Sequence, residues 1–277
     1  MPQFLTQSYL SSLLILFVLF FSSCSNSNSR SFNFTYEVKV DSSQNKKLEL
    51  WIPIPKTNEV QIISNLKIDT DRLDYEILEE SKFNNQYLYI YALDGTSESK
   101  LIKINFDVVR FEHSNVSYKN INPGDYLGSY SMVPVGNIFN KIIQENQLNS
   151  KNIKGVYDFV LSGMHYGKPK DETSIYYDDP WLTKNGKYGM KNVSRDKVVN
   201  LYKKAKKSGG SYTFGNGNSL YACDIGVGNC TDYHSYFMSL TKTLDVPSRF
   251  HMGFSIPTKY SSGVVGGYHC WADYYVE

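Results

Sequence analysis

Residues 226–237 read GVGNCTDYHSYF, and this stretch decides the fold of the C-terminal half of the chain. A glycine-containing turn precedes Cys230, and the apolar residues Tyr233, Phe237 and Leu240 then follow at helical spacing. A thiol in the first turn of a helix lies beside backbone N–H groups that have no helical partner, and these stabilise a thiolate. We therefore predict that Cys230 opens a helix, is exposed at the mouth of the turn and is reactive.

A reactive thiol needs a base, and histidine is the side chain whose pKa suits that task. Of the five histidines, His269 is the best placed, because it begins a predicted strand that follows Gly266 and Gly267. The same helix N-terminus can stabilise an oxyanion that forms beside the sulfur. Cys230 and His269 are thus the predicted nucleophile and base.

Three segments in this order resemble the transglutaminase-like superfamily: GNCTDY at 228–233, LDVPSRF at 244–250 and GYHCWAD at 267–273. The resemblance covers roughly residues 150–277 and implies a papain-like α+β core. It implies that the Cys230 thiolate attacks an amide carbonyl, releases an amine, and that water or a second amine resolves the thioester, with His269 as the base.

The resemblance also implies a third catalytic residue, an Asp on the strand after the histidine strand. The sequence ends at Glu277, inside the predicted histidine strand, so we expect a C-terminally truncated core in which the third triad Asp is not present. Asp273 does not replace it, because four residues along a strand place it ~13 Å from His269.

The leading hypothesis is therefore an exported, lipid-anchored cysteine acyltransferase or peptidase, a hydrolase acting on protein or peptide amides without a cofactor. The alternative is a catalytically inert cell-surface binding or assembly module with the same core. A zinc site built on Cys230 and His234, one helical turn apart, is disfavoured because no compact pair of ligand motifs accompanies them. Asp232 is predicted to complement the helix dipole rather than to act as an acid.

Upstream, the apolar pattern changes to strict alternation. Phe32, Phe34, Tyr36, Val38 and Val40 share one face of a strand, and further strands are predicted at 48–54, 59–68, 86–92 and 100–110. This pattern predicts an antiparallel β-sandwich over residues 32–113, with Pro53 and Pro55 at a sheet edge or bend. The fold class is therefore α+β, a β-sandwich followed by the papain-like core.

Between these parts, residues 114–136 are predicted to be a linker, and residues 137–277 the catalytic domain. Helical spacing begins at Ile138, and a second helix is predicted to start with Ser150 as its cap. Residues 166–193 are expected to form an irregular loop, and a third helix is predicted from Ser194.

The first thirty residues are predicted to lie outside the fold. Residues 13–21 are an apolar run of nine, too short to span a bilayer but typical of a secretory signal. Residues 21–24, FSSC, resemble a bacterial lipobox. The resemblance implies a lipoprotein signal peptide at 1–23 and lipidation of Cys24, with a polar tether at 24–31. We expect attachment to a membrane through this lipid.

Composition limits the remaining possibilities. A formal net charge of +2 gives no reason to expect nucleic-acid binding. Four cysteines are too few for a disulfide scaffold. In an exported compartment, however, Cys223 and Cys270 are a candidate disulfide that leaves Cys230 free, because strand alternation points Cys270 away from the side used by His269.

Overall fold

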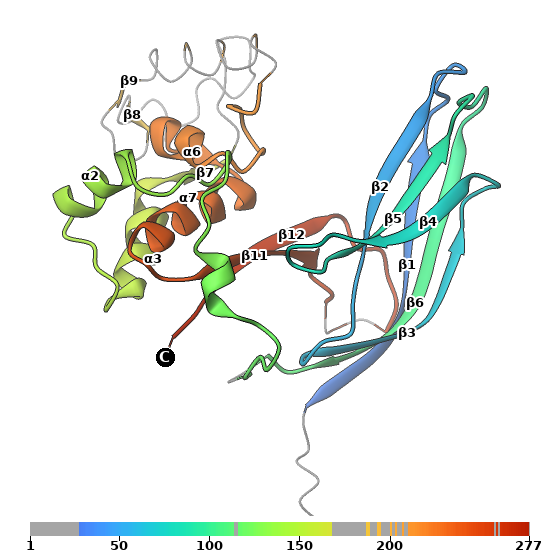
Figure 1. Ribbon diagram of the computed structural model, residues 1–277, viewed down its shortest axis with the longest axis horizontal. Helices are drawn as coiled ribbons and strands as arrows, with labels where there is room; N and C mark the ends of the chain where they lie inside the picture. The colour runs from blue at the N-terminus through green and yellow to red at the C-terminus, as the bar shows by residue number, and fades with distance from the viewer. Residues whose placement is uncertain are drawn as a thin grey trace, which may run out of the picture. The chain divides into compact units, whose positions relative to one another are not determined.

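The computed structural model describes residues 28–113, 116–167, 187–188, 193–194, 200, 203, 207, 210–257, 259 and 261–276. The chain forms two compact units, Met1–Asn120 and Ile121–Glu277 (Figure 1). Within the described ranges, no helix has the length and apolar character needed to cross a membrane. The predicted signal peptide, Cys24 and nearly all of the 166–193 loop and of the helix from Ser194 lie outside the described residues.

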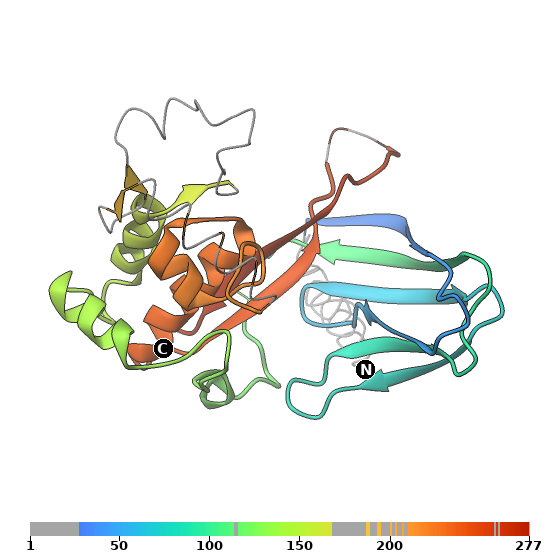
Figure 2. The ribbon, with the colours of Figure 1, turned by 90° about the horizontal axis from the view of Figure 1, so that it is seen from above.

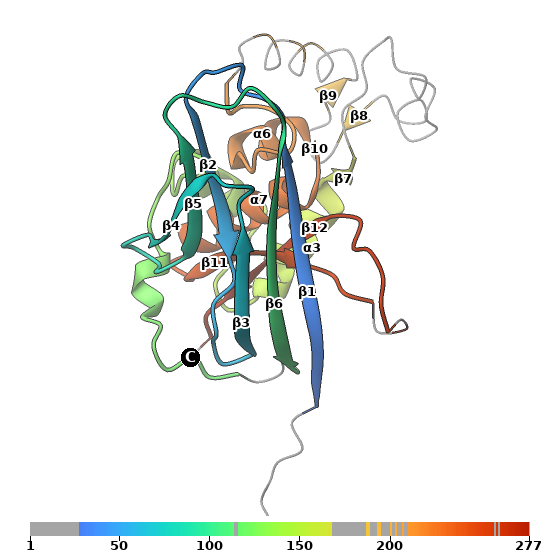
Figure 3. The same cartoon turned by 90° about the vertical axis from the view of Figure 1, so that its right-hand side faces the viewer.

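The first unit is a sandwich of two three-stranded antiparallel sheets (Figure 3). One sheet has the order β1-β6-β3, and its strands are β1 Ser29–Val40, β6 Lys100–Phe111 and β3 Gln61–Asp69. The other has the order β2-β5-β4, and its strands are β2 Leu48–Ile54, β5 Gln86–Ala92 and β4 Asp74–Glu79. The predicted α+β class with an N-terminal antiparallel sandwich is confirmed.

The core of this unit is formed by the inward-facing residues of both sheets. Each sheet contributes four buried side chains: Ile52, Ile54, Leu88 and Ile90 from one, and Ile102, Ile104, Phe106 and Val108 from the other. The alternating apolar residues of β1 are half-buried against them, as the pattern predicts. Pro53 lies in β2, an edge strand, which is where a sheet tolerates proline.

The second unit places helices against a long two-stranded sheet (Figure 2). Its helices are η2 Pro123–Tyr126, α2 Ile138–Glu145, α3 Ile153–Gly163, α6 Ser219–Ile225 and α7 Cys230–Thr243. Its strands are β7 His165–Tyr166, β8 Lys187–Tyr188, β9 Val193–Ser194, β10 Val227–Gly228, β11 Ser248–Phe254 and β12 Tyr268–Tyr274. The strands β11 and β12 pair antiparallel, whereas β10 and β7 pair parallel.

Helix α7 is the centre of this unit. Its residues Tyr236, Phe237 and Leu240 are buried in a core that also receives Phe139 of α2 and Val156 of α3. The prediction of a helix opening at Cys230 is confirmed. The predicted cap at Ser150 is wrong, because the side chain of Asn152 accepts a hydrogen bond from the Gly155 N–H and α3 begins at Ile153.

Candidate active site

The first turn of α7 is held by reciprocal hydrogen bonds between its cap and its third residue. The Asn229 side chain accepts from the N–H groups of Thr231 at 3.0 Å and Asp232 at 3.4 Å. In return, the Asp232 carboxylate accepts from the Asn229 N–H at 3.1 Å. This capping box satisfies backbone donors that the helix itself leaves unpaired, and it orients Cys230 at the first helical position.

Asp232 also ties the preceding glycine-rich segment to the helix. Its buried carboxylate accepts from the N–H groups of Gly215 at 2.9 Å and Gly217 at 3.2 Å. Burial raises the pKa of this carboxyl, and the backbone donors oppose that effect. Asp232, a first-turn residue of the helix as predicted, thus also fixes the backbone of the glycine-rich segment to α7.

The turn also depends on Gly228, which lacks a Cβ. A Cβ built there would lie 2.5 Å from the Cβ of Asp232 and 2.8 Å from its Oδ2. The backbone at position 228 lies so close to the Asp232 side chain that there is no room for a Cβ, and this position therefore requires glycine.

Cys230 is only 8% exposed, so the prediction that it lies exposed at the mouth of the turn is wrong. Cys270, Thr231 and Tyr166 lie close enough to its sulfur to influence its pKa. Burial works to raise the pKa of Cys230, but the bonds from Cys270, Thr231 and Tyr166 outweigh it, so the pKa lies below its ordinary value.

Tyr166 is a site residue that sequence reasoning missed. It lies in β7, which pairs parallel with β10, and its register partner is Gly228. Burial, then the charge of Cys230 and a hydrogen bond to it, raise the pKa of Tyr166. A strand of two residues has no readable periodicity, so the sequence carried no signal for this contact.

Strand β12 brings a different residue to Cys230 than the sequence predicted. Cys270, Ala272 and Tyr274 face α7: Ala272 packs against the core, and the Tyr274 ring centroid lies 6.2 Å from that of Phe237. Because side chains alternate along a strand, His269 belongs to the opposite face, and it is exposed. No hydrogen bond joins His269 to Cys230 in the part of the chain that the structure describes.

His269 nevertheless influences the site, because its charge acts on the pKa of His234. Burial lowers the pKa of His234, a hydrogen bond with the Cys230 carbonyl opposes this, and the charge of His269 lowers it further. The Nδ1 of His234 lies 2.5 Å from that carbonyl oxygen and 3.7 Å from the Cys270 sulfur. Among the described residues, no cluster of three or more potential ligands forms a metal site.

The predicted Cys223–Cys270 disulfide does not form in the structure, where Cys223, Cys230 and Cys270 are all thiols. The Cys270 sulfur instead lies 3.8 Å from the Thr231 hydroxyl and beside Cys230, whereas Cys223 hydrogen-bonds with Tyr236. The two sulfurs therefore have different partners, one at the start of α7 and the other further along that helix.

The face of the β11–β12 pair opposite α7 carries a second polar cluster. Arg249 donates two hydrogen bonds of 2.8 Å and one of 2.9 Å to the Asp273 carboxylate, and His251 Nε2 lies 3.0 Å from the same group. The Trp271 ring stacks on His251, with centroids 5.5 Å apart. Asp273 is thus engaged by Arg249 and His251, and not by His269.

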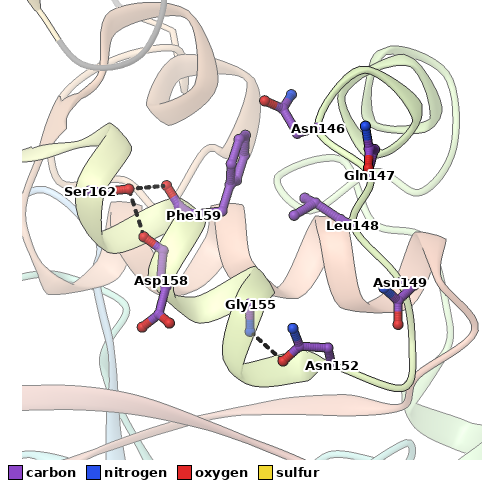
Figure 4. Close-up of a pocket in the computed structure, with 9 residues that line it drawn as sticks. All are labelled: Asn146, Gln147, Leu148, Asn149, Asn152, Gly155, Asp158, Phe159 and Ser162. Atoms are coloured by element: carbon purple, nitrogen blue, oxygen red, sulfur yellow. Dashed lines mark hydrogen bonds between the residues drawn. The ribbon is translucent and has the colours of Figure 1, made fainter.

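A hollow of about 350 Å³ lies at the end of α2 and along α3 (Figure 4). Amide and apolar groups line it, among them Asn146, Asn152 and Phe159. None of its lining residues belongs to the cysteine site, so it is not a substrate pocket for Cys230.

Comparison with known proteins agrees with this geometry. A model of the transglutaminase-like superfamily matches residues 181–277, which include Cys230, His269 and both strands of the β11–β12 pair. Residues 181–277 of this chain are therefore similar to the transglutaminase-like superfamily. A comparison of the chain with curated proteins finds no match.

Two solved structures match over 90% of this chain. One is a proposed cysteine protease from Cytophaga hutchinsonii, with a TM-score of 0.55 and 12% identity over 90% of this chain and 74% of that one. The other is the periplasmic domain of TgpA from Pseudomonas aeruginosa bound to ethylmercury, with a TM-score of 0.32 and 12% identity over 90% of this chain and 70% of that one. The likeness to the Cytophaga hutchinsonii protein shows that it and this chain share a fold.

Proposed function

We propose that this protein is a cysteine enzyme that cleaves or transfers the acyl group of protein or peptide amides through a thioester on Cys230. The observation that carries the proposal is the position of this thiol, which opens a capped helix and has a pKa below its ordinary value. A thiolate is the form of cysteine that attacks a carbonyl.

In this mechanism the Cys230 thiolate attacks the amide carbonyl, and the oxyanion forms beside the N–H groups of the first turn of α7. His269 gives a proton to the leaving amine and then activates the water or amine that releases the acyl group. His269 has to move toward the sulfur for this step, since catalytic hydrogen bonds often tighten only when substrate binds.

A second function, an inert binding or assembly module, has one observation in its favour. The exposed His269 belongs to the strand face opposite Cys270 and makes no hydrogen bond to Cys230 in the described structure. A site without its base keeps the fold but turns over no substrate.

The test compares single variants in two assays. Iodoacetamide alkylation measures the thiolate, while incorporation of a fluorescent amine into casein and release of ammonia from casein measure transfer and hydrolysis. We expect Cys230→Ala to abolish alkylation at this site and both activities, whereas Cys223→Ala, a matched change at another buried thiol, preserves them.

Substitutions of His269 and His234 distinguish the enzyme from the inert module. We expect His269→Gln to lower turnover at least 100-fold, a loss typical of a general base, and to change alkylation little. A chain that alkylates rapidly but shows no turnover, with His269→Gln identical to the wild type, is the inert module. If His234→Gln rather than His269→Gln abolishes turnover, the base is His234.

We further propose that the protein is exported and anchored by a lipid on Cys24, since the residues before it resemble a lipobox. The test is metabolic labelling with an alkyne fatty acid in a bacterial host. Label should enter the wild type and not Cys24→Ser. Label that persists in the variant would contradict the anchor.

A further inference from the structure

Two thiols from distant parts of the sequence lie side by side at the candidate site. Cys230 opens α7 and Cys270 lies in β12, and each thiol shifts the pKa of the other. The Cys270 sulfur also lies 3.8 Å from the Thr231 hydroxyl and 3.7 Å from the His234 ring. Thr231 and His234 follow Cys230 on the same helix, so Cys270 is held against the first turn from several sides.

The two thiols differ in their access to solvent and in their charge. Cys230 is 8% exposed, and Cys270 is 0% exposed. Burial raises the pKa of Cys270 to about 12, helped by the hydrogen bond to Cys230, whereas the pKa of Cys230 lies below its ordinary value. A reagent in solution therefore meets a nucleophilic Cys230 first, and Cys270 stays protonated behind it.

We propose that Cys230 and Cys270 form a reversible disulfide when the protein meets a small-molecule disulfide, with Cys270 as the resolving thiol. The Cys230 thiolate attacks one sulfur of the reagent and expels the first thiolate. Cys270 then attacks the Cys230 sulfur of the mixed disulfide and expels the second thiolate, which leaves with the Cys270 proton. The protein loses two hydrogen atoms, and the reagent is reduced to two thiols.

Cys270 is the resolving thiol because the other described cysteine has a different neighbour. Cys223 is buried in the helical core and influences the pKa of Tyr236. The Cys270 sulfur, by contrast, lies 3.8 Å from the hydroxyl of Thr231, the residue after Cys230, and shares an electrostatic interaction with Cys230. A disulfide requires the two sulfurs to approach to about 2 Å, and Cys270 is held against the turn of the helix that carries Cys230.

This disulfide has a functional consequence, which rests on the proposed function. A sulfur bonded to Cys270 has no thiolate and cannot attack an amide, so the oxidised protein is inactive until a thiol reduces it. An oxidising compartment outside the cytoplasm permits the oxidised state to persist.

The experiment exposes the folded protein to oxidised glutathione and maps its disulfides by mass spectrometry without reduction. A Cys24→Ser substitution in all samples leaves only Cys223, Cys230 and Cys270. We expect a peptide that links Cys230 to Cys270, no retained glutathione, and loss of alkylation at Cys230 that dithiothreitol reverses. In Cys270→Ser, glutathione should remain bound to Cys230, while Cys223→Ala should behave as the parent.

The disulfide map of the Cys24→Ser parent gives a result even if the further Cys270→Ser substitution prevents folding. Stable glutathione on Cys230 beside a reduced Cys270, or a link that includes Cys223, overturns the proposal. Rapid alkylation of Cys230 without the Cys230–Cys270 link overturns it and leaves the proposed function standing. The link without amide turnover of the reduced protein supports this inference and contradicts the proposed function. A Cys230 that neither alkylates nor oxidises contradicts both.

Discussion

Asp232 is a buried carboxylate that is held by backbone N–H groups of Gly215, Gly217 and Asn229. One side chain thereby joins the loop before the site, the turn and the helix that carries the nucleophile. Removing its charge affects three backbone donors at once, and a buried donor that loses its acceptor is costly.

We predict that Asp232→Asn lowers the free energy of unfolding by roughly 1–3 kcal/mol, because an amide NH₂ then faces N–H donors. Alkylation of Cys230 should also slow, since the turn that positions it loosens. Urea unfolding and iodoacetamide kinetics measure the two effects. The control is Asp158→Asn, which removes an exposed partner of Lys154 and should change stability by less than about 0.5 kcal/mol. Equal effects of the two substitutions would argue against the proposed role of Asp232.

Asp273 gives a pH-dependent prediction. Burial works to raise its pKa, but hydrogen bonds from His251 and Arg249 lower it from 3.8 to about 2. The stabilisation is present in full above pH 4, where the carboxylate is ionised in both states, and it is lost as the pH falls through 2. Urea titrations from pH 5 to pH 2 should show a loss about 2 kcal/mol larger for the wild type than for Asp273→Asn. Parallel curves for the two proteins would show that Asp273 is not the group that titrates.

At the scale of an element, the start of α7 depends on the absence of a side chain before it. We predict that Gly228→Ala destabilises the second unit by about 1–3 kcal/mol, because its Cβ would overlap Asp232. The same change should slow alkylation of Cys230. Gly263→Ala is the matched control, since a Cβ there meets nothing within 4 Å. Thermal unfolding of both variants tests this, and a Gly228→Ala protein as stable as Gly263→Ala would be the contrary result.

Elements with a strong apolar period could be predicted from the sequence, and weakly patterned elements could not. The strands at 48–54 and 86–92 match β2 and β5, because each buries alternate side chains in the sandwich. Strand β4, Asp74–Glu79, was missed because its acidic residues are poor strand formers and it lies at an edge, where most of its side chains stay exposed. Helix α6, Ser219–Ile225, was missed because seven residues show too little period.

The site was predictable in part for the same reason. The N-terminal position of Cys230 follows from the local sequence and its capping residues, so it was found. The partner of its sulfur depends on which face of β12 turns toward α7, and alternation alone gives two faces without saying which is inward. Alternation correctly separates His269 from Cys270, but the inward face is set by Ala272 and Tyr274 packing on the helical core.

At the scale of the whole molecule, the two units have separate cores. The buried sandwich residues, such as Ile104, and the buried residues of the helical core, such as Leu240, form distinct clusters. Each core belongs to one stretch of the chain, so we expect each unit to unfold cooperatively by itself.

We predict that Ile104→Ala, which removes a side chain only 1% exposed, costs the first unit about 2–5 kcal/mol and leaves the second unit unchanged. Pulsed alkylation of Cys223 and Cys270 across a urea series reports the second unit, and its midpoint should not move. Leu240→Ala, in the second core, should lower that midpoint. If Ile104→Ala lowers it equally, the two units unfold as one.

The pairing of β1 with β6 sets the order of events during synthesis. Val40 pairs with Lys100 and Ser29 with Phe111, so the first strand of the sandwich has no partner until the last strand has left the ribosome. Its apolar residues remain uncovered through that interval, and an unpaired strand with an apolar face is a template for association with other chains. A holdase that covered β1 until residue 111 had emerged would prevent this association.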